Sequence, residues 1–221
     1  MSETASLQKL LTWFSPSFPV GTFAWSAGLE TAIVEGQTTD SSTVRDWIEG
    51  TLTAGAMRTD AILLTHAYAA VREPYRLQEL SELALALAPS AERRAEMVTI
   101  GEAFGLAART GWASDIFPRL PPACPYAVTA GAIAAAHGIE LPATLTSFLT
   151  AAVQAQVSVA VRLVPLGQTE GLRIMAALES LIAALVRQLP ALNLDEIGGI
   201  PYAADIAQMR HETLPTRIFR S

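Results

Sequence analysis

The stretch that decides the fold is 142–189, PATLTSFLTAAVQAQVSVAVRLVPLGQTEGLRIMAALESLIAALVRQL. Pro142 suits the first turn of a helix, where its missing N–H would be unpaired in any case, and no charged side chain follows it until Arg162. After a Pro-Leu-Gly break, apolar residues recur every three or four positions, at Ile174, Leu178, Leu181, Leu185 and Leu189. The stretch therefore predicts two consecutive long helices, 142–163 and 168–189.

Similar punctuation marks the rest of the chain. The predicted helix starts are Ser41 or Ser42, Pro74, Ser90 and Pro125, and the predicted ends include Gly111 and Gly138. No run of alternating apolar and polar residues lies between hairpin turns, so strands have no support. The connections are short and marked by proline. We expect an all-α fold in which residues 1–221 form a single compact bundle of about eight to ten helices.

Composition excludes several functions. The 221 residues carry a net charge of -6, and their arginines are scattered, so we expect no nucleic-acid partner. Lys9 is the only lysine and lies near the N-terminus, which excludes a Walker-type phosphate loop and a Schiff-base enzyme. A single cysteine fits a reducing compartment, and Met1–Leu10 lacks the pattern of a secretory signal, so we expect a cytoplasmic protein.

Two uncharged stretches, Leu120–Ile139 and Leu141–Val161, suggest a membrane protein as an alternative. The first contains three prolines and a histidine, and the second contains two glutamines and several hydroxyl side chains. Both are rich in alanine rather than leucine. We expect buried helices and no membrane, with a membrane-associated helical protein as the weaker alternative.

The side chains that carry out catalysis or bind metals do not form a recognisable set. The histidines, His66, His137 and His211, lie in no metal-ligand spacing; the first two fit packed or capping positions, and the third fits a polar surface or partner contact. Cys124 fits a small buried side chain, and Ser26 lacks the glycine that a nucleophile elbow needs two places earlier. We expect neither an enzyme nor a metal or cofactor site.

Two motifs lie near the N-terminus: Ser15–Phe23 (SPSFPVGTF) and Trp25–Glu30 (WSAGLE). Pro16 and Pro19 restrict φ, and Gly21 permits a positive φ, so the sequence predicts a turn of fixed shape that leads into a helix.

The apolar side of that helix is predicted from the spacing of Leu29, Ile33 and Val34. Glu30 and Glu35 then face outward into solvent.

A third motif, Arg162–Thr169 (RLVPLGQT), would expose Arg162 and Gln168 beside the break between the two long helices. A fourth motif closes the chain, and its members are Asp205-Ile206, Met209, His211-Glu212 and Arg217–Ser221 (RIFRS).

The four motifs together resemble the UreF family of urease accessory proteins, in order and nearly in spacing, over the full length of the chain. The resemblance implies a homodimer that binds the accessory protein UreD, called UreH in some organisms. It further implies that this assembly recruits the GTPase UreG with its nickel to apo-urease, so that the chain is a scaffold, regulator and chaperone of nickel insertion. The resemblance assigns no cofactor to this chain.

The resemblance also suggests where partners bind. In a flexible docking tail at 212–221, Phe219 would be the apolar anchor and the flanking arginines would be polar clamps. The residues expected to dock UreD/UreH are His211, Glu212, Arg217, Ile218, Phe219 and Arg220. The residues expected in a further partner-binding or dimer surface are Pro19, Gly21, Phe23, Trp25, Ser26, Gly28, Glu30, Arg162 and Gln168.

One alternative stays within the same family. Arg162 would act as an arginine finger and accelerate GTP hydrolysis by UreG directly. The chain also departs from the family pattern at Trp25, at Ala27 and at Leu214-Pro215-Thr216. We expect Pro215 to stop the last helix.

Overall fold

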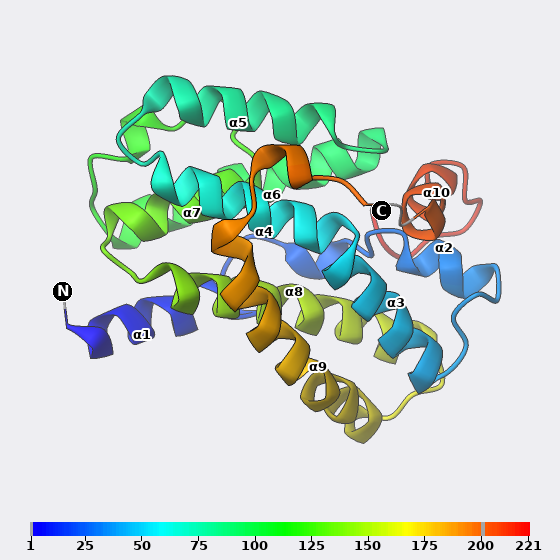
Figure 1. Cartoon of the computed structure of the whole chain (residues 1–221). Helices are drawn as coiled ribbons and strands as arrows, with labels where there is room; N and C mark the ends of the chain where they lie inside the picture. Colours follow the sequence, from blue (N-terminus) through cyan, green and yellow to red (C-terminus); the bar gives the residue numbers. More distant parts are fainter. Residues whose placement is uncertain (1, 200–201) are drawn as a thin grey trace.

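The computed structural model describes residues 2–199 and 202–221. Its described residues form ten α-helices and four short 3₁₀ turns, and no strand occurs among them, which confirms the all-α prediction (Figure 1). The α-helices are α1 (Glu3–Trp13), α2 (Leu29–Val34), α3 (Ser41–Thr53), α4 (Ala56–Ala69), α5 (Pro74–Ala86), α6 (Ala91–Gly111), α7 (Tyr126–Ala136), α8 (Leu141–Leu163), α9 (Gln168–Gln188) and α10 (Tyr202–His211). The 3₁₀ turns are η1 (Thr22–Ala24), η2 (Phe117–Arg119), η3 (Leu189–Ala191) and η4 (Leu194–Glu196).

The helix starts show how well local signals work. Pro74 occupies the first turn of α5, and the Ser90 side chain accepts a hydrogen bond from Arg93 N at 3.0 Å to cap α6, as predicted. The start of α3 differs from the prediction: Asp40, one residue earlier than expected, caps this helix by accepting from Thr43 N at 2.9 Å. A carboxylate satisfies the free N–H groups of a helix start as well as a hydroxyl does.

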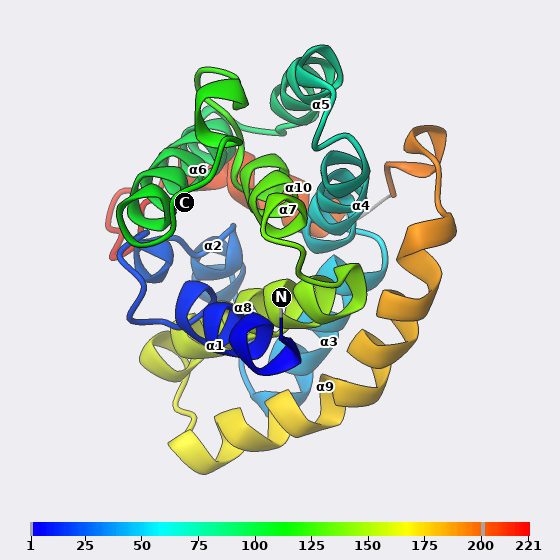
Figure 2. The same ribbon diagram turned by 90° about the vertical axis from the view of Figure 1, so that its left-hand side faces the viewer.

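The centre of the bundle is the close pairing of α4 with α7. A Cβ added to Gly131 of α7 would lie 2.3 Å from the carbonyl oxygen of Leu64 in α4, so only glycine permits this approach. Ile62, Leu63 and Leu64 are fully buried beside it. Around this pair, α8 runs across the bundle, α5 covers one side and α9 lies along an edge (Figures 1 and 2).

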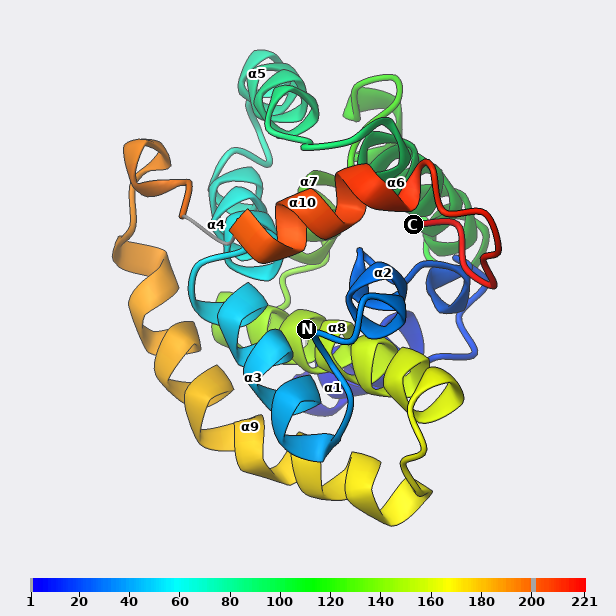
Figure 3. The ribbon, with the colours of Figure 1, turned by 90° about the vertical axis from the view of Figure 1, so that its right-hand side faces the viewer.

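The two ends of the chain come to opposite parts of this frame. Figure 2 shows α1 against α8, where Trp13 packs edge-on to Phe104 of α6 with their ring centres 6.1 Å apart. Figure 3 shows α10 beside α2, with the C-terminus next to both. The frame therefore brings residues 24–30 together with residues 204–221, which are far apart in sequence.

Two segments, α8 and Gln168–Ala191, are long and apolar enough to cross a membrane. The core helix of a soluble protein meets the same requirement, and half of the apolar window in α8 is buried inside this fold. Length and apolarity alone are thus weak evidence for a span.

His66, His137 and Cys124, which we expected to have packing or capping roles, all contact or lie within the folded chain. His66 Nε2 lies 3.0 Å from the carbonyl oxygen of Leu192, and the His137 ring packs against Trp13 with its centre 5.4 Å away. Cys124 is buried, and this burial raises the pKa of its thiol.

Candidate functional site

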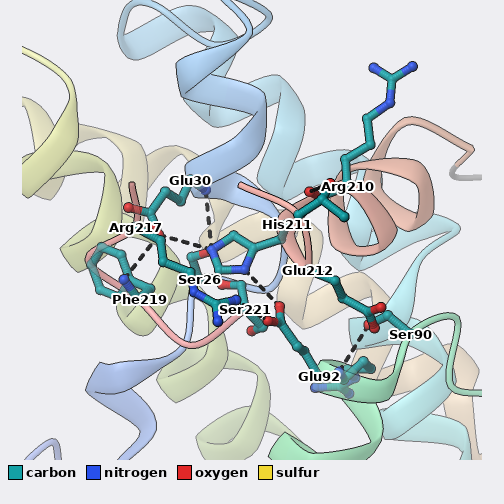
Figure 4. Close-up of polar contacts among 12 residues, drawn as sticks. Ser26, Glu30, Ser90, Glu92, Arg210, His211, Glu212, Arg217, Phe219 and Ser221 are labelled. Carbon is teal, nitrogen blue, oxygen red and sulfur yellow. Dashed lines mark hydrogen bonds and ion pairs between the residues drawn. The ribbon is translucent and has the colours of Figure 1, made fainter. Parts of the chain in front are cut away.

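A network of buried polar contacts lies at the C-terminus, where Arg217–Ser221 folds back onto the chain; we call this segment the strap. Its main chain pairs with the segment before α2, because Arg220 N donates to Ala24 O at 2.8 Å and Ser26 N donates to Ser221 O at 2.8 Å. The Ser26 hydroxyl also donates to Ser221 O (Figure 4). Gln156 of α8 also holds Ser26 in place, since its side-chain amide donates to Ser26 O at 2.9 Å.

Glu30 is the acceptor at the centre of this region. Its two carboxylate oxygens accept from Ile218 N at 2.7 Å and from Phe219 N at 3.0 Å. The residue is only 3% exposed, so the prediction that Glu30 faces solvent was wrong, whereas Val34, predicted to be buried, is exposed. Helical spacing alone could not show that two strap N–H groups, one of them in the buried residue Phe219, need an acceptor on this side of α2.

His211 fixes α10 to the same carboxylate. Its Nε2 lies 3.0 Å from Glu30 Oε2, and its Nδ1 lies 2.7 Å from Glu92 Oε2 in α6 (Figure 4). The residue is fully buried, so the prediction of a polar surface role for His211 was wrong. One imidazole therefore joins α2, α6 and α10 inside the protein.

Further polar contacts bind this end of the chain to α6 and α2. Arg217 pairs with Glu92, and Glu212 accepts from Ala91 N, at the start of α6, at 2.7 Å (Figure 4). Arg210 pairs with Glu35 at 3.0 Å across the surface of α2 and α10. Glu212 and the strap therefore lie against the chain itself, whereas we expected residues 212–221 to form a flexible tail.

Phe219 is packed inside this chain. Its side chain is 4% exposed and belongs to the main apolar core. The Arg162 guanidinium lies over its ring at 5.9 Å from the centre, and the Arg220 guanidinium lies over Trp25 at 5.7 Å. In this structure the apolar contact of Phe219 is with its own protein, and the two arginines predicted as clamps, Arg217 and Arg220, contact Glu92 and Trp25 of the same chain.

An exposed apolar stripe remains beside the strap, on the outer face of α10. Tyr202, Ile206 and Met209 are 67%, 43% and 50% exposed and follow one another at intervals of four and three residues. Residues so spaced lie on one face of a helix. The opposite face of α10, including Ala204, Ala207 and His211, is buried. This stripe was missing from the predicted site, although the i, i+4, i+7 spacing was visible in the sequence.

Comparison with known proteins identifies the family of this chain. The family model of UreF matches residues 38–179. The chain belongs to the UreF family. The urease accessory protein UreF of Rhodopseudomonas palustris strain HaA2 is 44% identical over 99% of this chain and 95% of its own length. The urease accessory proteins UreF of Rhizobium etli and Agrobacterium fabrum are 44% and 42% identical over 100% of this chain, and the matches cover 100% and 98% of their own lengths.

The remaining predicted residues of this UreF-family chain are divided between the strap region and the open surface. Trp25, Ser26, Gly28 and Glu30 lie under the strap or against α10. The residues that lie exposed, outside the strap contacts described above, are Pro19, Phe23 and Gln168. Gly21 has φ +76°, as its predicted turn requires. Pro215 does not end the last helix, because α10 already ends at His211.

A cavity of about 260 Å³ lies behind the site, between α4, α6, α8 and the N-terminal segment. On its wall, Arg93 pairs with Asp60 at 2.5 Å and with Glu96 at 2.9 Å. Burial raises the pKa of the Glu96 carboxyl despite the Arg93 charge beside it. Within the described residues, no group of three histidine, cysteine or acidic side chains is placed to hold a metal ion.

Gly28 lets α10 approach α2, and this gives a first prediction. A Cβ there would lie 2.9 Å from Gln208 N, and φ is +83°. We expect Gly28→Ala to lower the free energy of unfolding by about 2 kcal/mol more than Gly21→Ala does, since Gly21 has a similar φ but open space around it. Urea unfolding of both variants measures this difference. Equal losses would show that backbone strain alone matters and that the contact with α10 does not.

Proposed function

We propose that this chain is a non-catalytic scaffold for urease maturation, which docks UreD/UreH and recruits UreG with its nickel to apo-urease. In this proposal it works as a cytoplasmic homodimer and regulates nickel insertion without binding a cofactor of its own. Membership of the UreF family and the names of its relatives support the urease context.

The observation that carries the docking part is the exposed stripe of Tyr202, Ile206 and Met209 on α10. A helix that buries one face in its own protein and leaves an apolar face in water has the pattern of a helix that lies in a partner's groove. The C-terminal end of α10 is fixed in place, because His211 in its last turn contacts Glu30 of α2 and Glu92 of α6. A fixed helix loses little conformational entropy on binding.

Replacing apolar side chains of this stripe with aspartate tests the docking surface. We expect Ile206→Asp with Met209→Asp to weaken the complex with UreD by about 2–4 kcal/mol, because burying a carboxylate in an apolar interface is costly. The matched control is Leu172→Asp on α9, since Leu172 is 71% exposed but lies on another helix. Co-purification with UreD and urease activation in cells are the measurements.

Equal co-purification of the α10 variant and the α9 control would contradict the proposal. Deletion of Ile218–Ser221 would test docking less well, because it also removes the buried Phe219 side chain and two hydrogen bonds to Glu30.

The alternative in which Arg162 accelerates GTP hydrolysis has no comparable support. The Arg162 guanidinium already lies over the Phe219 ring of its own chain, which gives it a structural contact in this UreF-family fold.

A further inference from the structure

Five aromatic side chains line the cavity of about 260 Å³ between α4, α6, α8 and the N-terminal segment, namely Trp13, Phe14, Trp25, Tyr126 and Phe148. All of them except Tyr126 are buried. Walls of this kind are typical of sites that bind small organic molecules. An engineered apolar cavity of about 150 Å³ is already large enough to bind benzene. The cavity therefore has room for a ligand whose apolar body is about the size of one aromatic ring.

The cavity opens to solvent between α8 and the segment that precedes α2. Three of the residues that line it, Pro16, Phe23 and Gln154, are exposed at the surface. Other lining residues, among them Glu96 and Gln156, are buried. The cavity therefore leads from the surface to polar side chains inside the protein.

One buried acceptor of the cavity wall has no partner. Gln156 is 5% exposed, and its Oε1 finds no hydrogen-bond partner among the described residues. Its side-chain nitrogen donates to Ser26 O at 2.9 Å, so turning the amide over would set one oxygen against another. An unpaired buried acceptor is expensive, and a ligand that donates a hydrogen bond to Gln156 Oε1 would remove this cost.

The charged groups of the same wall show which sign of charge the ligand would carry. Within the described part of the chain, the charged residues that line the cavity are Asp60, Arg93 and Glu96. Arg93 pairs with both carboxylates, so one guanidinium serves two acidic groups. Burial raises the pKa of the Glu96 carboxyl although Arg93 lies beside it, so further positive charge would stabilise its ionised form. Aromatic faces also attract cations.

We propose that this cavity binds a small organic cation, whose ammonium group donates to Gln156 Oε1 and is attracted by the acidic groups of Asp60 and Glu96. The apolar body of the ligand packs among the aromatic rings. This site goes beyond the proposed scaffold role and does not depend on which partner the chain docks.

Titration calorimetry of the full-length protein with 2-phenylethylamine tests the site. The matched probe is 2-phenylethanol, which has the same ring and chain length but a neutral hydroxyl group. We expect the amine to bind with a Kd below about 1 mM and at least about tenfold more tightly than the alcohol. No binding of the amine, or equal binding of the two probes, would overturn the proposal.

A pair of variants on α8 locates the bound amine. Ala155 lines the cavity, and Ala155→Phe would fill part of it, so we expect the affinity for the amine to fall at least about tenfold. The control is Ala143→Phe, because Ala143 is an exposed residue of the same helix that does not line the cavity. Equal affinities of the two variants would place the amine elsewhere and contradict the proposal.

The unaltered protein gives the same information if Ala155→Phe fails to fold. Trp13 and Trp25 line the cavity and Trp47 does not, so the indole N–H signals of these residues report where the amine binds. We expect the signals of Trp13 and Trp25 to shift as the amine is added and that of Trp47 to stay in place. Shifts at Trp47 alone would overturn the proposal. These measurements involve neither UreD nor urease, so their failure is distinct from a failure of the scaffold role.

Discussion

Glu30→Ala lowers the free energy of unfolding by about 3–5 kcal/mol, the range typical of breaking a buried charged contact. The carboxylate is 3% exposed and accepts from His211 Nε2, Ile218 N and Phe219 N. Its removal takes the acceptor from three donors, two of which belong to the buried residues His211 and Phe219, and each unpaired buried donor has a cost of its own. Chemical denaturation of the full-length protein measures the loss.

Glu35→Ala is the matched control for this change. Glu35 belongs to the C-terminal end of the same helix and also pairs with an α10 side chain, Arg210, but the pair lies at the surface. Surface ion pairs contribute little, so we expect a loss within about 1 kcal/mol. Losses of equal size at the two positions would mean that the buried carboxylate does not organise this region.

Phe219→Ala is expected to cost about 3–5 kcal/mol of unfolding free energy, because it leaves a cavity in a packed core. The neighbouring side chain provides the control: Ile218 is 72% exposed, and we expect Ile218→Ala to change stability by no more than about 0.5 kcal/mol. Thermal or urea unfolding of the protein without any partner is the measurement.

This pair of variants also separates two roles of Phe219. An anchor that binds a partner would leave the stability of the isolated protein unchanged when removed and would weaken only the complex. A loss of stability in the isolated protein, as we expect, shows that the ring belongs to the core of its own chain. No loss of stability would restore the original prediction of a docking anchor.

Much of the fold followed from local signals in the sequence. The two long helices predicted at 142–163 and 168–189 correspond to α8 (Leu141–Leu163) and α9 (Gln168–Gln188). Pro74 and Ser90 marked helix starts correctly, because the geometry of a first turn depends on only a few neighbouring residues. Family membership was also predictable, since the motifs extend over the whole chain.

The arrangement of the C-terminus was less predictable. Glu30 and His211 are 181 positions apart in sequence, and no local pattern showed that one carboxylate would serve a histidine and two strap amides. A polar sequence around His211 suggested an exposed tail, yet its side chains find charged partners on α2 and α6. Burial of a polar group depends on its partners, and these became visible only in the fold.

Amide hydrogen exchange across residues 202–221, followed for the protein alone and with UreD, tests the central claim most directly. We expect Ile218 and Phe219 to be protected already in the isolated protein near neutral pH, and UreD to add protection mainly along α10. Exchange of both amides at the rate of a free peptide in the isolated protein, with protection appearing only when UreD binds, would contradict it.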